Sequence, residues 1–68
     1  MANLPKVDPK GILGMSELNA AGFLLQYGIQ TRVVSRDGVE SPLTEEYVPN
    51  RWDLEIFNGV IVGIRLPK

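Results

Sequence analysis

The dipeptide Asn58-Gly59 is the feature that most constrains the fold of this 68-residue chain. It separates two runs rich in β-branched and aromatic residues, 51–57 and 60–66. Asn-Gly between two such runs is a strong hairpin signal, because both residues accept the positive φ angles of a two-residue turn. The sequence therefore predicts an antiparallel pair of strands at 51–57 and 60–66.

The first strand of this hairpin has two different faces. Apolar and acidic residues alternate along it with the period of a strand, as Trp52, Asp53, Leu54, Glu55 and Ile56. The two-residue turn predicts that Leu54 pairs with Gly63 and that Ile56 pairs with Ile61. The second strand carries apolar residues on both faces, so the pattern leaves its buried face open.

Residues 16–27 are predicted to form a helix. Ser16 is a suitable N-cap, Glu17 suits the positive end of the helix dipole, and Gly28 suits a left-handed C-terminal cap. One helical face collects residues at the i, i+3, i+4, i+7 spacing, and we expect it to pack on the sheet. Its members are Leu18, Ala21, Gly22 and Leu25.

A long connection separates the hairpin from an earlier strand. Residues 29–35 are rich in β-branched residues and predict a strand, which Asp37-Gly38 ends. Residues 42–50 show neither a helix period nor a turn dipeptide, and a connection of this length allows strands 29–35 and 51–57 to lie parallel. The predicted fold class is α+β, with one helix packed on a small mixed sheet and a long extended loop.

A chain of this length forms a single domain. We expect an irregular N-terminal arm at residues 1–13, where Pro5, Pro9 and Gly11 stand among charged residues, and one domain at residues 14–68. The predicted core consists of Leu18, Ala21, Leu25, Val33, Leu54 and Ile56.

Composition excludes several classes of function. Cysteine and histidine are absent, which removes disulfides, thiolate zinc sites, the commonest metal ligand and the commonest general base. The net charge is −1 and the basic residues are scattered, so we expect no nucleic-acid partner. No apolar run reaches the length of a membrane span, and no signal peptide is recognised, so cytoplasmic location is the default expectation. We expect neither an enzyme nor a cofactor or metal site.

Residues 44–51 hold a short ordered motif, with Thr44, one variable residue, Glu46, Tyr47 and then Arg51. Together with the preceding helix and strand and the final hairpin, it resembles the potato type I serine protease inhibitors and their bacterial relatives. The resemblance covers roughly residues 14–65. It implies a substrate-like, standard-mechanism inhibitor of serine proteases, in which the loop 42–50 binds across the protease active site as an added strand.

The resemblance also implies roles for individual residues. Glu45 would enter the specificity pocket, and the attacked bond would join Glu45 to Glu46. Arg51 would reach back to Glu46 and stiffen the loop, with Pro49 and Trp52 as further support. The residues implied to contact the protease are Leu43, Thr44, Glu45, Glu46, Tyr47 and Val48.

Two positions depart from the family pattern. Asp53 stands where many plant members carry a second supporting arginine, so one support of the loop is expected to be missing. Glu45 replaces the large apolar residue of well-known members, and a carboxylate suits a protease with a basic, glutamate-preferring pocket.

Other interpretations remain open. Glu45 and Glu46 are also typical of solvated loop charges. Trp52 could form a ligand platform with Tyr47, but its place on a strand face with Leu54 and Ile56 is more typical of core or loop support. The main alternative function is a non-inhibitory interaction module or small regulator on the same scaffold. Its partner would then be a protein other than a protease.

Overall fold

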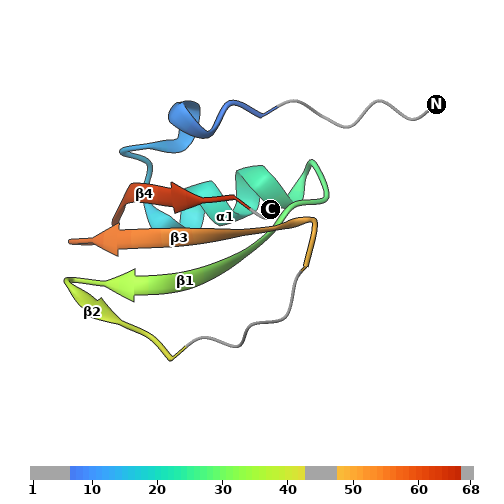
Figure 1. Ribbon diagram of the computed structural model, residues 1–68. Helices are drawn as coiled ribbons and strands as arrows, with labels where there is room; N and C mark the ends of the chain where they lie inside the picture. The colour runs from blue at the N-terminus through green and yellow to red at the C-terminus, as the bar shows by residue number, and fades with distance from the viewer. Residues whose placement is uncertain (1–6, 43–47, 67–68) are drawn as a thin grey trace.

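A computed structural model describes residues 7–42 and 48–66 of the chain. Six elements follow one another, with a short 3-10 helix η1 first, then one α-helix and four strands (Figure 1). Their bounds are η1 Pro9–Ile12, α1 Glu17–Leu25, β1 Gln30–Arg36, β2 Val39–Glu40, β3 Arg51–Phe57 and β4 Val60–Arg65.

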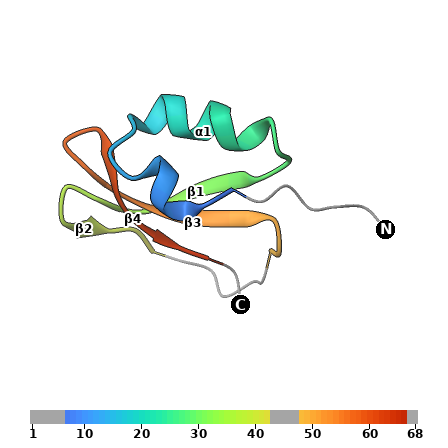
Figure 2. The same ribbon diagram turned by 90° about the horizontal axis from the view of Figure 1, so that it is seen from above.

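The strands form one mixed sheet, and α1 covers one of its faces (Figure 2). The strand order is β2-β1-β3-β4, in which β1 and β3 are parallel and the other two pairs are antiparallel. The predicted fold class, one helix on a small mixed sheet, is confirmed. So is the parallel pairing of the two strands joined by the long connection.

The hairpin β3–β4 has the predicted turn but a different register. Ile56 pairs with Ile61 as predicted, whereas Gly63 pairs with Glu55 and Leu54 pairs with Ile64. The prediction that Leu54 pairs with Gly63 is wrong because a bulge at Val62 shifts the pairing by one residue. Gly63 fits this position because a Cβ there would lie 2.9 Å from Glu55 Cδ.

The two tight turns lie together at one end of the sheet (Figure 1). The backbone N–H of Asn58 donates to Asp37 Oδ1 at 2.7 Å, and the N–H of Asp37 donates to the Ile56 carbonyl at 2.9 Å. Both central residues of each turn have positive φ, with Asp37-Gly38 at 53° and 82°. Asp37-Gly38 therefore opens a second hairpin into the two-residue strand β2, which the sequence interpretation treated only as the end of β1.

The ends of α1 follow their predicted signals. Ser16 Oγ accepts from the N–H of Asn19 at 3.2 Å. At the other end Gly28 has φ +74°, its N–H donates to the Leu25 carbonyl, and the N–H of Ile29 donates to the Leu24 carbonyl. These two bonds form a Schellman motif, so the predicted cap at Gly28 is confirmed.

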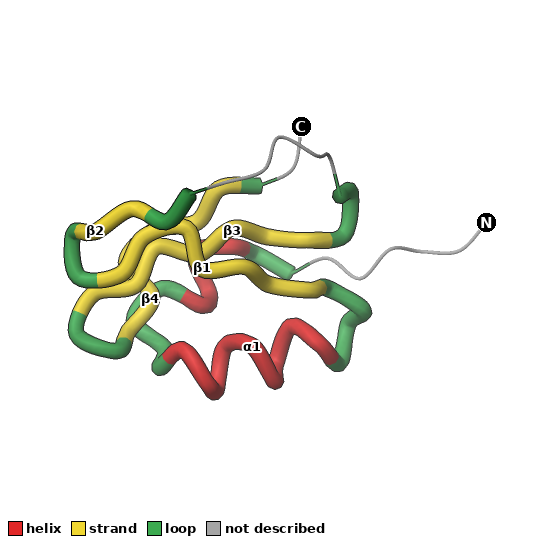
Figure 3. Tube along the Cα trace, turned by 90° about the horizontal axis from the view of Figure 1, so that it is seen from below, coloured by secondary structure: helices red, strands yellow, loops and turns green. Residues whose placement is uncertain are grey.

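The predicted buried face of α1 is wrong. Leu18 is 83% exposed and Leu25 is 66% exposed, whereas Ala20 and Leu24 are fully buried. Almost every residue of this nine-residue helix is apolar, so its pattern does not select a face. α1 lies along one face of the sheet (Figure 3). Burial of Ala20 and Leu24 sets its rotation, and Glu17 on the same side of the helix pairs with Arg36 of β1.

The core lies between α1, η1 and the sheet. Leu54 and Ile56 are buried as predicted, and Val33 packs against the core while remaining partly exposed. The expectation of an irregular arm does not hold for Pro9–Ile12, because these residues form η1 and place Ile12 in the core. The buried core cluster consists of Ile12, Ala20, Leu24, Leu54, Ile56 and Ile61.

The ion pair between Glu17 and Arg36 predicts a pH-dependent contribution to stability. Both hydrogen bonds between the two side chains are 2.8 Å long, and bonding to Arg36 lowers the pKa of Glu17 below its ordinary value of 4.5. A lowered carboxyl pKa stabilises the folded state above the ordinary value, and this contribution is lost as the pH falls through the folded-state pKa. We expect Glu17→Gln to lower the melting temperature only slightly at pH 7, because solvent screens such exposed pairs.

Melting curves of both proteins between pH 7 and pH 2 check this expectation. The difference in melting temperature is expected to shrink towards zero at the acid end. Arg36→Gln serves as the matched partner variant, and adding it to Glu17→Gln is expected to cause little further loss. A difference that persists at pH 2 would show that the Glu17 charge is not its cause.

Candidate functional site

The candidate site is the base of the segment 42–50, where the chain leaves β2 and enters β3. Of the residues expected to contact a protease, the structure describes Val48; Leu43, Thr44, Glu45, Glu46 and Tyr47 lie outside the described residues. Among 41–42 and 48–50, no residue belongs to a helix or strand, in agreement with the predicted loop.

Both ends of the segment are anchored on β1. At the entry, the N–H of Ser41 donates to the Val34 carbonyl at 3.0 Å. At the exit, the N–H of Gln30 donates to the Asn50 carbonyl at 2.7 Å. The two β1 residues that hold the ends of the segment, Gln30 and Val34, lie only four residues apart.

The entry anchor lies beside an irregularity in β1. The pairing of β1 with β3 shifts between Val33 and Ser35, which leaves Val34 without a partner on β3. Val34 is fully buried, and its carbonyl accepts the bond from Ser41. The acceptor that holds the start of the segment therefore belongs to the one buried residue of β1, next in the β1–β2 ladder after the pair of Ser35 with Glu40.

The exit anchor is doubled by the side chain of Asn50. Its Nδ2 donates to the Gly28 carbonyl at 3.2 Å, in the turn that ends α1. Asn50 itself belongs to a tight turn over residues 48–51. In this turn the N–H of Arg51 donates to the Val48 carbonyl at 3.2 Å, and Pro49 is exposed. The sequence interpretation missed Asn50, because its partner is a backbone carbonyl that no pattern reveals.

A charged cluster covers the face of the sheet opposite α1. Arg32 of β1 forms a bidentate pair with Asp53 of β3, with Nε–Oδ1 at 3.1 Å and Nη2–Oδ2 at 2.9 Å. Arg51 Nε lies 4.0 Å from Asp53 Oδ1. All three side chains are largely covered, with exposed fractions of 25% for Arg32, 21% for Asp53 and 16% for Arg51.

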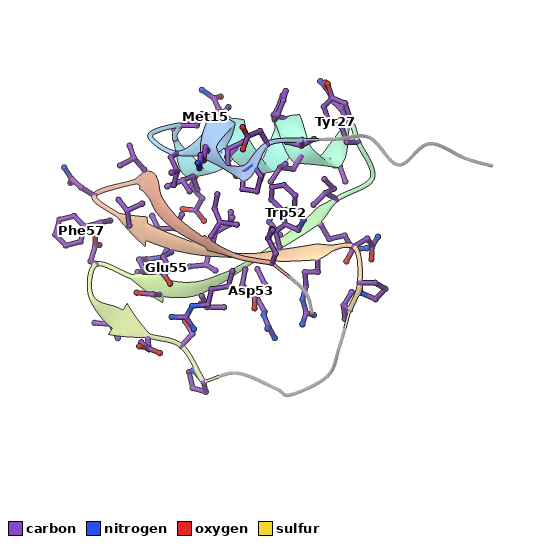
Figure 4. All side chains as sticks on the ribbon, turned by 45° about the horizontal axis from the view of Figure 1, so that its top comes forward. Met15, Tyr27, Trp52, Asp53, Glu55 and Phe57 are labelled. Carbon is purple, nitrogen blue, oxygen red and sulfur yellow. The ribbon has the colours of Figure 1, made fainter. Side chains whose placement is uncertain are left out.

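A second pair lies on the same face towards the sheet edge. Arg65 Nε of β4 donates to Glu55 Oε2 at 2.8 Å, and this bond raises the pKa of Arg65 above its ordinary value. Glu55 and Asp53 both point away from α1 (Figure 4). Charged side chains of opposite sign therefore alternate across β1, β3 and β4 on this face.

Trp52 lies on the other face of β3. It points towards α1 and packs against the hydrophobic core (Figure 4). This position agrees with the interpretation of Trp52 as a core residue, and it separates Trp52 from the charged cluster by the thickness of the sheet. Arg51, by contrast, shares the opposite face with Asp53; its predicted bond to Glu46 stays a prediction, since Glu46 is outside the described residues.

Within residues 7–42 and 48–66, no three potential metal ligands of the types His, Cys, Asp and Glu come together. In the same part of the chain, no helix combines the length and apolar character required to cross a membrane. Comparison of the chain with protein families, curated proteins and solved structures finds no match.

Proposed function

We propose that this protein is a substrate-like inhibitor of serine proteases that presents residues 42–50 to the enzyme, with Glu45 in the specificity pocket. The observation that supports the proposal is the anchoring of both ends of this segment on β1, through Ser41 and Asn50. The motif from Thr44 to Arg51 supports it independently, through its resemblance to the potato type I inhibitors.

Anchored ends favour inhibition for an entropic reason. A segment whose ends are already fixed loses less conformational freedom on binding, so more of the contact energy appears as affinity. Pro42 and Pro49 restrict their own φ angles and disfavour helix in the residues before them. An extended segment offers its backbone groups for pairing with an enzyme as an added strand.

The proposed inhibitor works without a disulfide, because the chain has no cysteine. Hydrogen bonds from Ser41 and Asn50 and the ion pairs on the sheet face take the place of a covalent constraint. Charge-assisted bidentate pairs combine strength with direction, which suits them to this role.

A panel of serine proteases tests the proposal. We expect stoichiometric inhibition of a glutamate-preferring protease and much weaker inhibition of enzymes with apolar pockets, because Glu45 requires a basic pocket. A synthetic peptide of residues 41–51 is the matched control, and we expect it to be cleaved without inhibiting. The measurement is residual protease activity against the molar ratio of inhibitor, with cleavage followed by mass spectrometry.

Two outcomes would contradict the proposal. In the first, the folded protein is digested at residues 42–50 as readily as the peptide. In the second, it neither inhibits nor is cleaved by any protease of the panel. Either result would favour the interaction module on the same scaffold.

A further inference from the structure

The carboxylate of Asp53 stands between arginines from two parallel strands. It holds Arg32 of β1 with two hydrogen bonds of 2.9 and 3.1 Å, and Arg51 Nε lies 4.0 Å from Oδ1, the oxygen that also accepts from Arg32 Nε. The pairing of β1 with β3 puts Arg32 directly opposite Asp53, so the two side chains meet without distortion of the strands. Asp53 lies on the face of the sheet opposite α1 (Figure 4).

The same three residues are connected to the exit of the segment through the backbone. The N–H of Arg51 closes the turn onto the Val48 carbonyl, and the preceding carbonyl of Asn50 accepts from Gln30 of β1. Gln30 pairs with Arg51 in the sheet, two residues before the pair of Arg32 with Asp53. A bond between Arg32 and Asp53 therefore holds together the N-terminal ends of β1 and β3, where the segment leads into β3.

From this arrangement we infer that Asp53 is a positioning residue for the exit turn of the segment, residues 48–51, and that it recruits Arg32 of the neighbouring strand as a second support beside Arg51. The inference rests on the proposed function only in that it concerns the base of the same segment. The family pattern predicts that Asp53, in place of a second arginine, leaves the base of the segment with Arg51 as its one supporting arginine. The structure instead places a second arginine there from β1, with the carboxylate as the link between the two.

The other described ion pairs join different elements from those joined by Arg32 and Asp53. Glu17 and Arg36 form an equally short bidentate pair, but on the α1 side of the sheet and with exposed fractions of 36% and 50%. Glu55 and Arg65 lie on the same face as Asp53 but join β3 to the outer strand β4. Among the described pairs, that of Arg32 with Asp53 links β1 to β3, the two strands that hold the exit of the segment.

Backbone amide exchange on the protein alone tests the inference. We expect Asp53→Asn to speed exchange of the Arg51 and Gln30 amides about tenfold, because a charge-assisted bond that closes this end is removed. Exchange of the Ile61 amide of β4, which donates to the Met15 carbonyl before α1, is expected to stay unchanged. Arg32→Gln is expected to reproduce the effect, and Glu17→Gln, which breaks the matched pair, is expected not to.

Asp53→Glu gives the rescue variant. It keeps a carboxylate beside Arg32 and Arg51, so we expect it to recover much of the slow exchange at Arg51 and Gln30 that Asp53→Asn loses. Equal acceleration at Ile61 would show that Asp53 only stabilises the whole fold and would overturn the inference. So would unchanged exchange in both Asp53→Asn and Arg32→Gln. Because no protease is present, the result is independent of the inhibition panel.

Discussion

Leu24→Ala is expected to lower the free energy of unfolding by about 3 kcal/mol, since it removes a fully buried side chain from the middle of the core. In a domain of this size each kcal/mol shifts the melting temperature by about 4–8 °C, so a drop of more than 10 °C is expected. The effect is large relative to the total stability, because a chain of this length buries only about 60% of its unfolded surface. Urea and thermal unfolding followed by circular dichroism measure it.

Leu25→Ala is the matched control, with the same change one residue further along α1. Leu25 is 66% exposed, and we expect its truncation to change the free energy of unfolding by less than about 0.5 kcal/mol. The pair of variants tests which face of α1 is buried. Equal losses, or a larger loss for Leu25→Ala, would contradict the packing of Leu24 on the sheet.

The three longer strands and the Asn58-Gly59 turn were predictable because their signals are local, whereas the short strand β2 was not predicted. The range of β3 is the predicted one, and the Asn58-Gly59 turn joins β3 to β4 as expected. The parallel pairing of β1 with β3 followed from the length of the connection between them. Ser16 and Gly28 marked the two ends of α1, because helix caps depend on the residues immediately around them.

The features that were not predicted depend on contacts between distant residues. The rotation of α1 is set by the burial of Ala20 and Leu24 against the sheet, and Glu17 then lies beside Arg36, nineteen residues away. The bulge at Val62 depends on the way Gly63 accommodates the Glu55 side chain. Ile12 becomes core only because η1 folds back over the sheet, which no periodicity in an arm rich in proline and glycine indicates.

The candidate site divides in the same way. Residues 42–50 stood out in the sequence, since they show neither a helix period nor a turn dipeptide and include Pro42 and Pro49. Its supports Arg32 and Asn50 were missed, because identifying them requires the register of β1 against β3 and the position of the Gly28 carbonyl. Asp53 shows the limit of reading a motif residue by residue. Its partner Arg32 lies on a neighbouring strand, and the motif does not include that strand.

Glu45→Leu is expected to tighten inhibition of subtilisin-like proteases about a hundredfold, which corresponds to about 3 kcal/mol. Under the proposed function this side chain enters the specificity pocket. An ionised carboxylate in an apolar pocket must lose its hydration or become protonated. Both processes weaken binding, and a leucine side chain requires neither. The melting temperature is expected to stay nearly unchanged, because under the proposed function this side chain is presented to the enzyme and contributes little to folding. Inhibition constants of both proteins against subtilisin and against a glutamate-preferring protease measure the change.

Glu40→Leu is the control for this substitution, since Glu40 is an exposed glutamate of β2 that lies outside the segment. It is expected to leave both inhibition constants unchanged, whereas Glu45→Leu is expected to weaken inhibition of the glutamate-preferring enzyme while strengthening that of subtilisin. This reversal of preference is the test, because a general increase in surface hydrophobicity would strengthen binding to both enzymes. If Glu45→Leu is cut by subtilisin without inhibiting it, and amide exchange at Arg51 and Gln30 is slow, the base of the segment is rigid but its function is not inhibition. The interaction module would then be the better account of why the chain anchors this segment at both ends.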